Sequence, residues 1–235
     1  SELSVLTLQF SQNHLKETNH YELLLTLDQL DGIPESIIES YAQTAKEKGK
    51  EGYIVTLQAP SYIPFMKYSA NRSLRQQLYM AYNTQCIHDN EYNNTEIVKK
   101  LVNLRLERAQ LLGYSSVADF VLKKRMAENS LNVYNLLDQL LEAYGPTAQK
   151  EVEEVQHLAK QLEGDDFQLM PWDWAYYSEK LKEQKFNFNE EELFEIIKTI
   201  KENILITNLL TGKLQITTIN LLSKIINHLS RELSP

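Results

Sequence analysis

Apolar residues recur every three or four positions over most of this chain, and few residues interrupt them. Only seven glycines and six prolines occur among its 235 residues. Because an α-helix turns once every 3.6 residues, this spacing predicts helices with one apolar face each. Side chains suited to cap a helix precede several of these stretches. The expected helices span 2–18 and 34–48, and others begin at Asn71, Asn94, Ser116, Ser130, Pro146 and Pro171.

Two short stretches near the N-terminus have a different pattern. Tyr21–Leu27 and Tyr53–Leu57 are rich in apolar and β-branched residues, and Gly52 and Pro60 bound the second of them. Stretches of this kind, separated by a helix, predict a small β-ribbon. The sequence therefore indicates a mainly α fold with one small β-ribbon near its N-terminus.

Prolines predict two interruptions of the helical pattern. Pro60 and Pro64 favour an extended backbone over Tyr62–Tyr68, since proline disfavours the helical conformation of the residue before it. Gly145 followed by Pro146 predicts that one helix ends and another begins there.

Charge and composition exclude several classes of partner. Hydrophobic residues make up 43% of the chain and charged residues 24%, as in ordinary globular domains. The net charge is −8 and no basic run is present, so nucleic acid is not an expected partner. No apolar stretch is long enough to cross a membrane and no leader-like start is present. We therefore expect a cytoplasmic protein without a membrane partner.

The aromatic residues divide the chain in two. The two Trp, 13 Tyr and seven Phe all lie at or before Phe194, and the later positions are rich in Ile, Leu, Asn and Lys. We therefore expect a helical region over 1–193 and a divergent tail over 194–235 that is either helical or poorly ordered. Its Ile and Leu stripes lack aromatic anchors and would suit pairing with another copy of the chain.

Histidine spacing argues against a zinc site within this sequence. An H-E-x-x-H site needs two imidazoles one helical turn apart with a glutamate between them. No histidine here has another within three to five positions, and the spacing of His228 and Glu232 is more typical of an exposed polar face. Glycine-rich phosphate loops and a G-x-S-x-G motif are also absent from the sequence. We assign no catalytic residue, metal ligand or cofactor to this chain.

The most unusual stretch, residues 171–177, has the sequence PWDWAYY and contains both tryptophans. On a helix, Trp172 and Tyr176 lie one turn apart, and Asp173 and Tyr177 form a neighbouring stripe. Two interpretations follow from this arrangement. One is core packing with an acidic residue in the first helical turn, and the other is a surface that lines a substrate site.

An ordered series of motifs resembles the thimet oligopeptidase and bacterial peptidyl-dipeptidase family of zinc metallopeptidases. The resemblance runs from about Leu3 to Leu193, and the order and spacing of the motifs make it specific. The matching stretches are 57–66 (LQAPSYIPFM), 71–75 (NRSLR), 89–94 (DNEYNN), 97–114 (IVKKLVNLRLERAQLLGY), 118–122 (ADFVL), 126–127 (MA) and 171–177 (PWDWAYY).

The resemblance implies a helical, two-lobed zinc peptidase that cleaves short peptides in a deep channel. It also implies that the H-E-x-x-H motif lies C-terminal to the matched region, so we expect this chain to be an interior part of such an enzyme and inactive alone. The chain would contribute part of the channel wall, and a few of its side chains would lie near the channel. The alternative is a non-catalytic helical binding or scaffold protein derived from the same family. The candidate channel-lining residues are Trp172, Asp173, Tyr176 and Tyr177.

Overall fold

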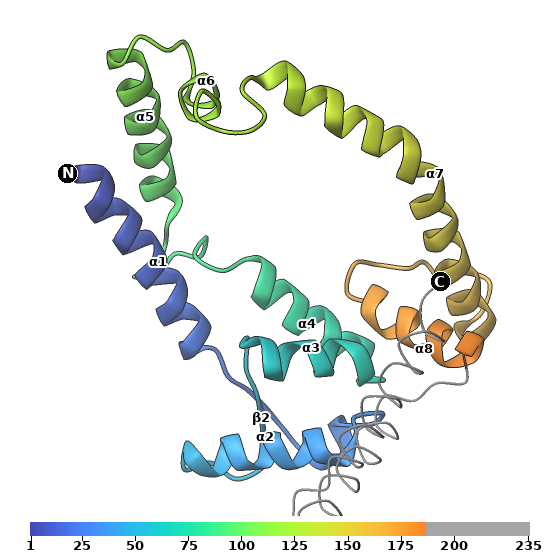
Figure 1. Cartoon of the computed structure of the whole chain (residues 1–235). Helices are drawn as coiled ribbons and strands as arrows, with labels where there is room; N and C mark the ends of the chain where they lie inside the picture. Colours follow the sequence, from blue (N-terminus) through green and yellow to red (C-terminus); the bar gives the residue numbers. More distant parts are fainter. Residues whose placement is uncertain (187–235) are drawn as a thin grey trace, which may run out of the picture. The chain divides into compact units, whose positions relative to one another are not determined.

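A computed structural model describes residues 1–186 of the chain (Figure 1). The predicted divergent tail over 194–235, its predicted self-association and the pair His228 and Glu232 lie outside these residues. The mainly α fold with a small β-ribbon near the N-terminus is confirmed. The elements are α1 (Glu2–His20), β1 (Leu23–Leu25), η1 (Leu27–Gln29), α2 (Glu35–Glu47), β2 (Tyr53–Val55), α3 (Ala59–Tyr68), α4 (Arg72–Asn83), α5 (Thr95–Leu111), α6 (Val117–Leu122), α7 (Ser130–Glu163) and α8 (Trp174–Phe186).

The β-ribbon pairs β1 with β2 in antiparallel register, with Leu24 opposite Ile54. Gly52 precedes β2 with a φ of +102°, and a Cβ at this position would lie 2.8 Å from the main-chain oxygen of Leu25. Only glycine fits such a conformation and such a close approach without strain. The ribbon packs against α2 and α3.

The segment predicted to be extended, Tyr62–Tyr68, is instead part of helix α3. That prediction was wrong because Pro60 lies in the first helical turn, where the missing N–H removes no intrahelical bond. Pro64 removes one bond from the helix, and burial of Phe65 and Met66 offsets this cost.

The break predicted at Gly145 and Pro146 is also wrong, since α7 continues through both residues as one 34-residue helix. Pro146 removes the hydrogen bond to the carbonyl four residues earlier, on exposed Glu142, where water can replace it. The helix bends partway along its length (Figure 1). Gly164, with a φ of +112°, ends the helix.

Most of the predicted helix starts are confirmed to within one residue. Asn71 caps α4 by accepting a hydrogen bond from the amide of Leu74, and Ser116 caps α6 in the same way. Helix α7 is capped by Asn129, so Ser130 is its first helical residue. A cap is recognisable in sequence because few side chains can reach the unpaired amides of the first turn.

The largest hydrophobic cluster joins the β-ribbon to α2, α3 and α4. Smaller clusters join α1 to α5 and α7 to α8. Among the described residues, no helix is long and apolar enough to cross a membrane. The buried members of the largest cluster are Leu23, Leu25, Leu30, Ile33, Tyr41, Val55, Leu57, Phe65, Met66 and Leu78.

Candidate functional site

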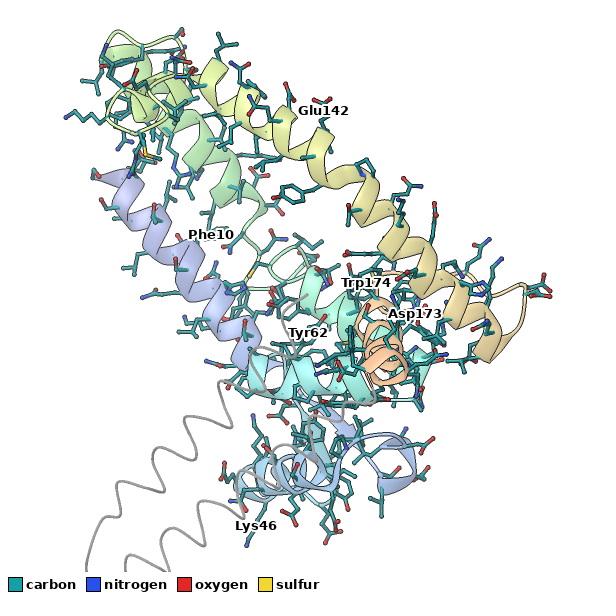
Figure 2. The ribbon with its side chains drawn as sticks, turned by 45° about the vertical axis from the view of Figure 1, so that its right-hand side comes forward. Phe10, Lys46, Tyr62, Glu142, Asp173 and Trp174 are labelled. Carbon is teal, nitrogen blue, oxygen red and sulfur yellow. The ribbon has the colours of Figure 1, made fainter. Side chains whose placement is uncertain are left out.

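The segment 171–177 lies at the start of α8, but the helix begins at Trp174 and not at Pro171 as predicted. Asp173 explains the difference, because its amide bonds to the carbonyl of Met170 at 2.8 Å and closes a turn before the helix. Its own carbonyl accepts from the amide of Tyr177 at 3.0 Å. Asp173 and Trp174 therefore stand together where the turn meets α8 (Figure 2).

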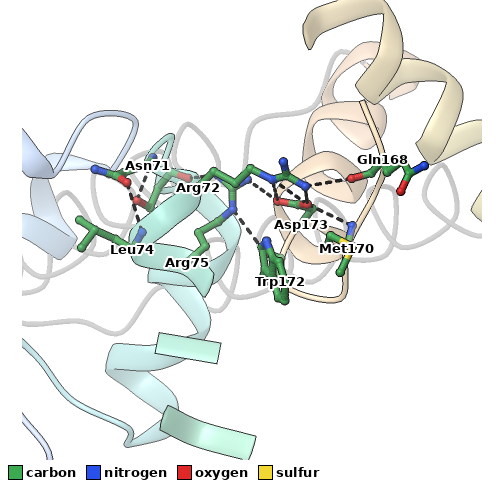
Figure 3. Close-up of polar contacts among 9 residues, drawn as sticks. Asn71, Arg72, Leu74, Arg75, Gln168, Met170, Trp172 and Asp173 are labelled. Atoms are coloured by element: carbon green, nitrogen blue, oxygen red, sulfur yellow. Dashed lines mark hydrogen bonds and ion pairs between the residues drawn. The ribbon is translucent and has the colours of Figure 1, made fainter. Parts of the chain in front are cut away.

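Asp173 is a fully buried carboxylate that pairs with two arginines of α4 (Figure 3). Oδ1 accepts from Nη2 of Arg75 and Oδ2 from Nη2 of Arg72, both at 2.8 Å. Nε of Arg72 also donates to both carboxylate oxygens, at 3.2 and 3.1 Å. These ion pairs join parts of the chain that lie 98 and 101 residues apart.

Arg75 is buried, and all three of its guanidinium nitrogens donate hydrogen bonds. Besides Asp173, it donates to the carbonyl of Ser69 at 2.7 Å and to that of Trp172 at 3.3 Å. Its guanidinium lies 4.2 Å from the centroid of the Tyr176 ring. A buried charge is tolerated when it is paired and hydrogen-bonded, and Arg75 meets both conditions.

Arg72 faces solvent on one side, with 43% of its side chain exposed. Its Nη2 also donates to the carbonyl of Gln168 at 2.9 Å, and its guanidinium lies 4.3 Å from the centroid of the Phe167 ring. The hydrogen bond to Asp173 raises the pKa of Arg72. Arg72 therefore stays charged and is held in one orientation.

The predicted channel-lining residues form one cluster around Arg75, but their exposure differs. Asp173 and Tyr177 are buried, whereas Trp172 and Tyr176 are half-buried. Burial, followed by a hydrogen bond to Glu163, raises the pKa of Tyr177. The side chains of Asp173 and Tyr177 thus hold the segment in place, and those of Trp172 and Tyr176 reach the surface.

The two arginines were not singled out from the sequence, although the stretch 71–75 was matched to the family. A signal was present, since Arg72 and Arg75 are three residues apart and therefore share one helix face. Nothing in the sequence identified their partner, because Asp173 lies so far along the chain.

A cavity of about 460 Å³ opens beside this cluster. Arg72, Ser73 and Gln76 of α4 line one side of it. The loop between α7 and α8 lines the other side with Asp166, Phe167, Gln168, Met170 and Trp172. The Asp173 carboxylate is sealed from solvent by its arginines, so Arg72 is the charged group of the cluster that a ligand can reach.

Among residues 1–186, no group of three or more His, Cys, Asp or Glu side chains could hold a metal ion. A hydrolytic zinc site normally uses three protein ligands, so the zinc implied by the family resemblance does not fit these residues. We derive no catalytic step from them.

Sequence comparison defines the class of protein. The peptidase family M3 profile matches residues 65–212, a range that includes α4, the arginines and the segment 171–177. The chain belongs to peptidase family M3.

Individual members of this family are similar to the chain over most of its length. Oligopeptidase A of Haemophilus influenzae is 38% identical over 196 residues, which cover 81% of this chain and 29% of that protein. Saccharolysin of Saccharomyces cerevisiae is 32% identical over 200 residues, covering 82% of this chain and 27% of that protein. Dipeptidyl carboxypeptidase of Escherichia coli is 27% identical over 209 residues, covering 87% and 30%. The chain therefore spans less than a third of the length of these relatives.

Proposed function

We propose that this chain forms part of the peptide-channel wall of a zinc-dependent oligopeptidase or peptidyl-dipeptidase that hydrolyses short peptides. Membership of peptidase family M3 supports this proposal, as do relatives named oligopeptidase A and dipeptidyl carboxypeptidase. In this proposal the chain supplies channel wall, and the metal and its ligands belong to the remainder of the protein.

The observation that carries the proposal is the attachment of residues 171–177 to α4. A fully buried carboxylate with two arginine partners fixes the main chain of this segment, while the aromatic side chains on either side of it reach the surface. Trp174 is 40% exposed, and Trp172 and Tyr176 are half-buried. Rigidly held aromatic surface of this kind suits contact with a peptide.

The alternative function is that of a non-catalytic helical binding or scaffold protein derived from the same family. Exposed apolar side chains on the first half of α7, including Leu131, Leu137 and Leu141, favour an interaction role. An H-E-x-x-H motif encoded downstream in the same reading frame would exclude this alternative.

The test uses the whole protein encoded by the gene, alongside chain 1–235 alone. Each is incubated with an internally quenched nonapeptide, with zinc and with a chelator, and the products are identified by mass spectrometry. We expect chelator-sensitive cleavage by the whole protein and none by chain 1–235. Release of C-terminal dipeptides indicates a peptidyl-dipeptidase, and internal cleavage indicates an oligopeptidase. A whole protein that binds peptides without cleaving them supports the scaffold function.

A further inference from the structure

The guanidinium of Arg72 lines the cavity, and one of its nitrogens makes no hydrogen bond to the described residues. Nε and Nη2 of Arg72 bond to Asp173 and Gln168, but Nη1 has no hydrogen-bond partner within residues 1–186. Arg72 lines the cavity, and Asp173 and the Phe167 ring hold its guanidinium in place. An immobilised guanidinium binds a carboxylate at little cost in side-chain entropy.

Charges of both signs lie around this cavity, and their exposure decides how strongly each acts on an anion. Arg72 and Arg75 carry two positive charges, and the buried carboxylate of Asp173 neutralises one of them. Asp166 also lines the cavity, and Glu163 interacts electrostatically with Arg72, so both carboxylates oppose an incoming anion. Asp166 and Glu163 are both exposed, so solvent screens their charges, whereas the two arginines surround a carboxylate that water does not reach.

The other side chains of the cavity supply neutral hydrogen-bonding groups and apolar walls. Ser73 and Gln76 lie beside Arg72 on α4, and neither side chain has a hydrogen-bond partner among the described residues. A hydroxyl and an amide can donate to a second carboxylate oxygen or to a peptide carbonyl. Phe167 and Trp172 offer apolar walls for an adjacent side chain.

We propose that this cavity binds a carboxylate group of a peptide, with Nη1 of Arg72 as the charged contact and Ser73 and Gln76 as neutral donors. The proposal rests on the proposed peptide-channel function for the identity of the ligand. The carboxylate is either the C-terminus of the peptide or an acidic side chain, since both present the same group.

Binding is measured on chain 1–235 by tryptophan fluorescence, because Trp172 lines the cavity and Trp174 is the only other tryptophan. Three probes are titrated: tetra-alanine, tetra-alanine amide, and N-acetyl-Ala-Glu-Ala-amide. Saturable binding of tetra-alanine but not of its amide assigns the site to the C-terminal carboxylate. Additional binding of the glutamate peptide assigns it to carboxylates in general. Equal binding of acid and amide, or no saturable binding, overturns the proposal.

Two surface substitutions test the site without disturbing the buried ion pairs. Asp166→Asn removes the opposing charge and should tighten binding of the carboxylate probe by about two- to fivefold, the range of an exposed charge interaction. Gln76→Glu adds an opposing charge and should weaken binding by a similar factor. The matched control is Glu96→Gln on α5, where the same loss of charge should leave binding unchanged. If Asp166→Asn and Gln76→Glu behave like this control, the cavity is not the site.

The binding experiment and the cleavage experiment can fail independently of each other. Charge-dependent binding to chain 1–235 together with a whole protein that cleaves no peptide would retain the carboxylate site and exclude the peptidase. Cleavage by the whole protein together with binding that neither Asp166→Asn nor Gln76→Glu changes would retain the peptidase and exclude this site.

Discussion

At the scale of single residues, Asp173 determines how the segment 171–177 is held. Replacing it with alanine leaves Arg75, with 1% of its side chain exposed, without a counter-charge. Removing one partner of a buried pair costs about 3–5 kcal/mol, because the other charge stays buried. We expect Asp173→Ala to lower the free energy of unfolding by about this amount, measured by urea denaturation followed by circular dichroism.

The control for this prediction is an exposed ion pair. Glu96 and Lys99 are 2.7 Å apart, with 75% and 64% of their side chains exposed. Glu96→Ala should change the stability by less than about 1 kcal/mol, as is usual for surface pairs. Equal losses for the two variants would show that Asp173 has no special structural role.

Cys86 provides a second prediction at this scale. It is buried, and burial together with a hydrogen bond to Glu17 raises the pKa of its thiol to about 12. Only the thiolate is nucleophilic, so the folded chain at pH 8 should react with a disulfide reagent on the order of a hundred times more slowly than the urea-unfolded chain. Similar rates in the two states would place the thiol in an open environment.

At the scale of elements, helix α7 lacks one backbone hydrogen bond that a single substitution can restore. Pro146 lies inside the helix and removes one backbone hydrogen bond. Pro146→Ala restores this bond, so we expect the helix to gain about 1–3 kcal/mol, seen as a higher thermal midpoint at 222 nm. Pro60→Ala is the matched control, since a proline in the first turn of α3 removes no such bond and its loss should be nearly neutral. A Pro146→Ala midpoint no higher than that of the control would show that Pro146 does not weaken the helix.

The junction of α1, β1 and α2 should respond to pH. Glu22 pairs with Lys48 and Lys50, and hydrogen bonds to these two lysines lower the pKa of its carboxyl to about 2. A carboxyl whose pKa is lower in the folded state stabilises the protein above its unfolded pKa of about 4.3 and loses that contribution as pH falls toward 2. Glu22→Gln should therefore be slightly less stable at pH 7 and equal to the parent chain near pH 2. A stability difference that persists at pH 2 would assign the effect to packing.

The elements differ in how far the sequence predicts them. The β-ribbon and the starts of α4 and α6 were predicted because short runs of apolar and β-branched residues, and capping side chains, act locally. Pro64 and Pro146 misled the prediction because tertiary burial and exposed carbonyls offset their local cost. The pairing of Asp173 with Arg72 and Arg75 joins distant parts of the chain, and one sequence carries no local signal for it.

At the scale of the whole molecule, the chain matches one part of longer proteins of its family. It belongs to peptidase family M3 and spans 29% of the length of Haemophilus oligopeptidase A. The family was recognisable from ordered motifs such as NRSLR and PWDWAYY. The structure adds that these two motifs contact each other through Asp173 and its arginines. A single buried ion-pair cluster thereby connects motifs that are remote in sequence.

We propose that this connected surface lies on the peptide channel of the whole protein. Photo-crosslinking tests it most directly, with the whole protein and a short peptide that contains benzoylphenylalanine, followed by mass spectrometry of the adducts. We expect adducts on Trp172, Trp174 or Tyr176 that unlabelled peptide suppresses in competition. Competed adducts found only outside residues 1–186 would contradict it.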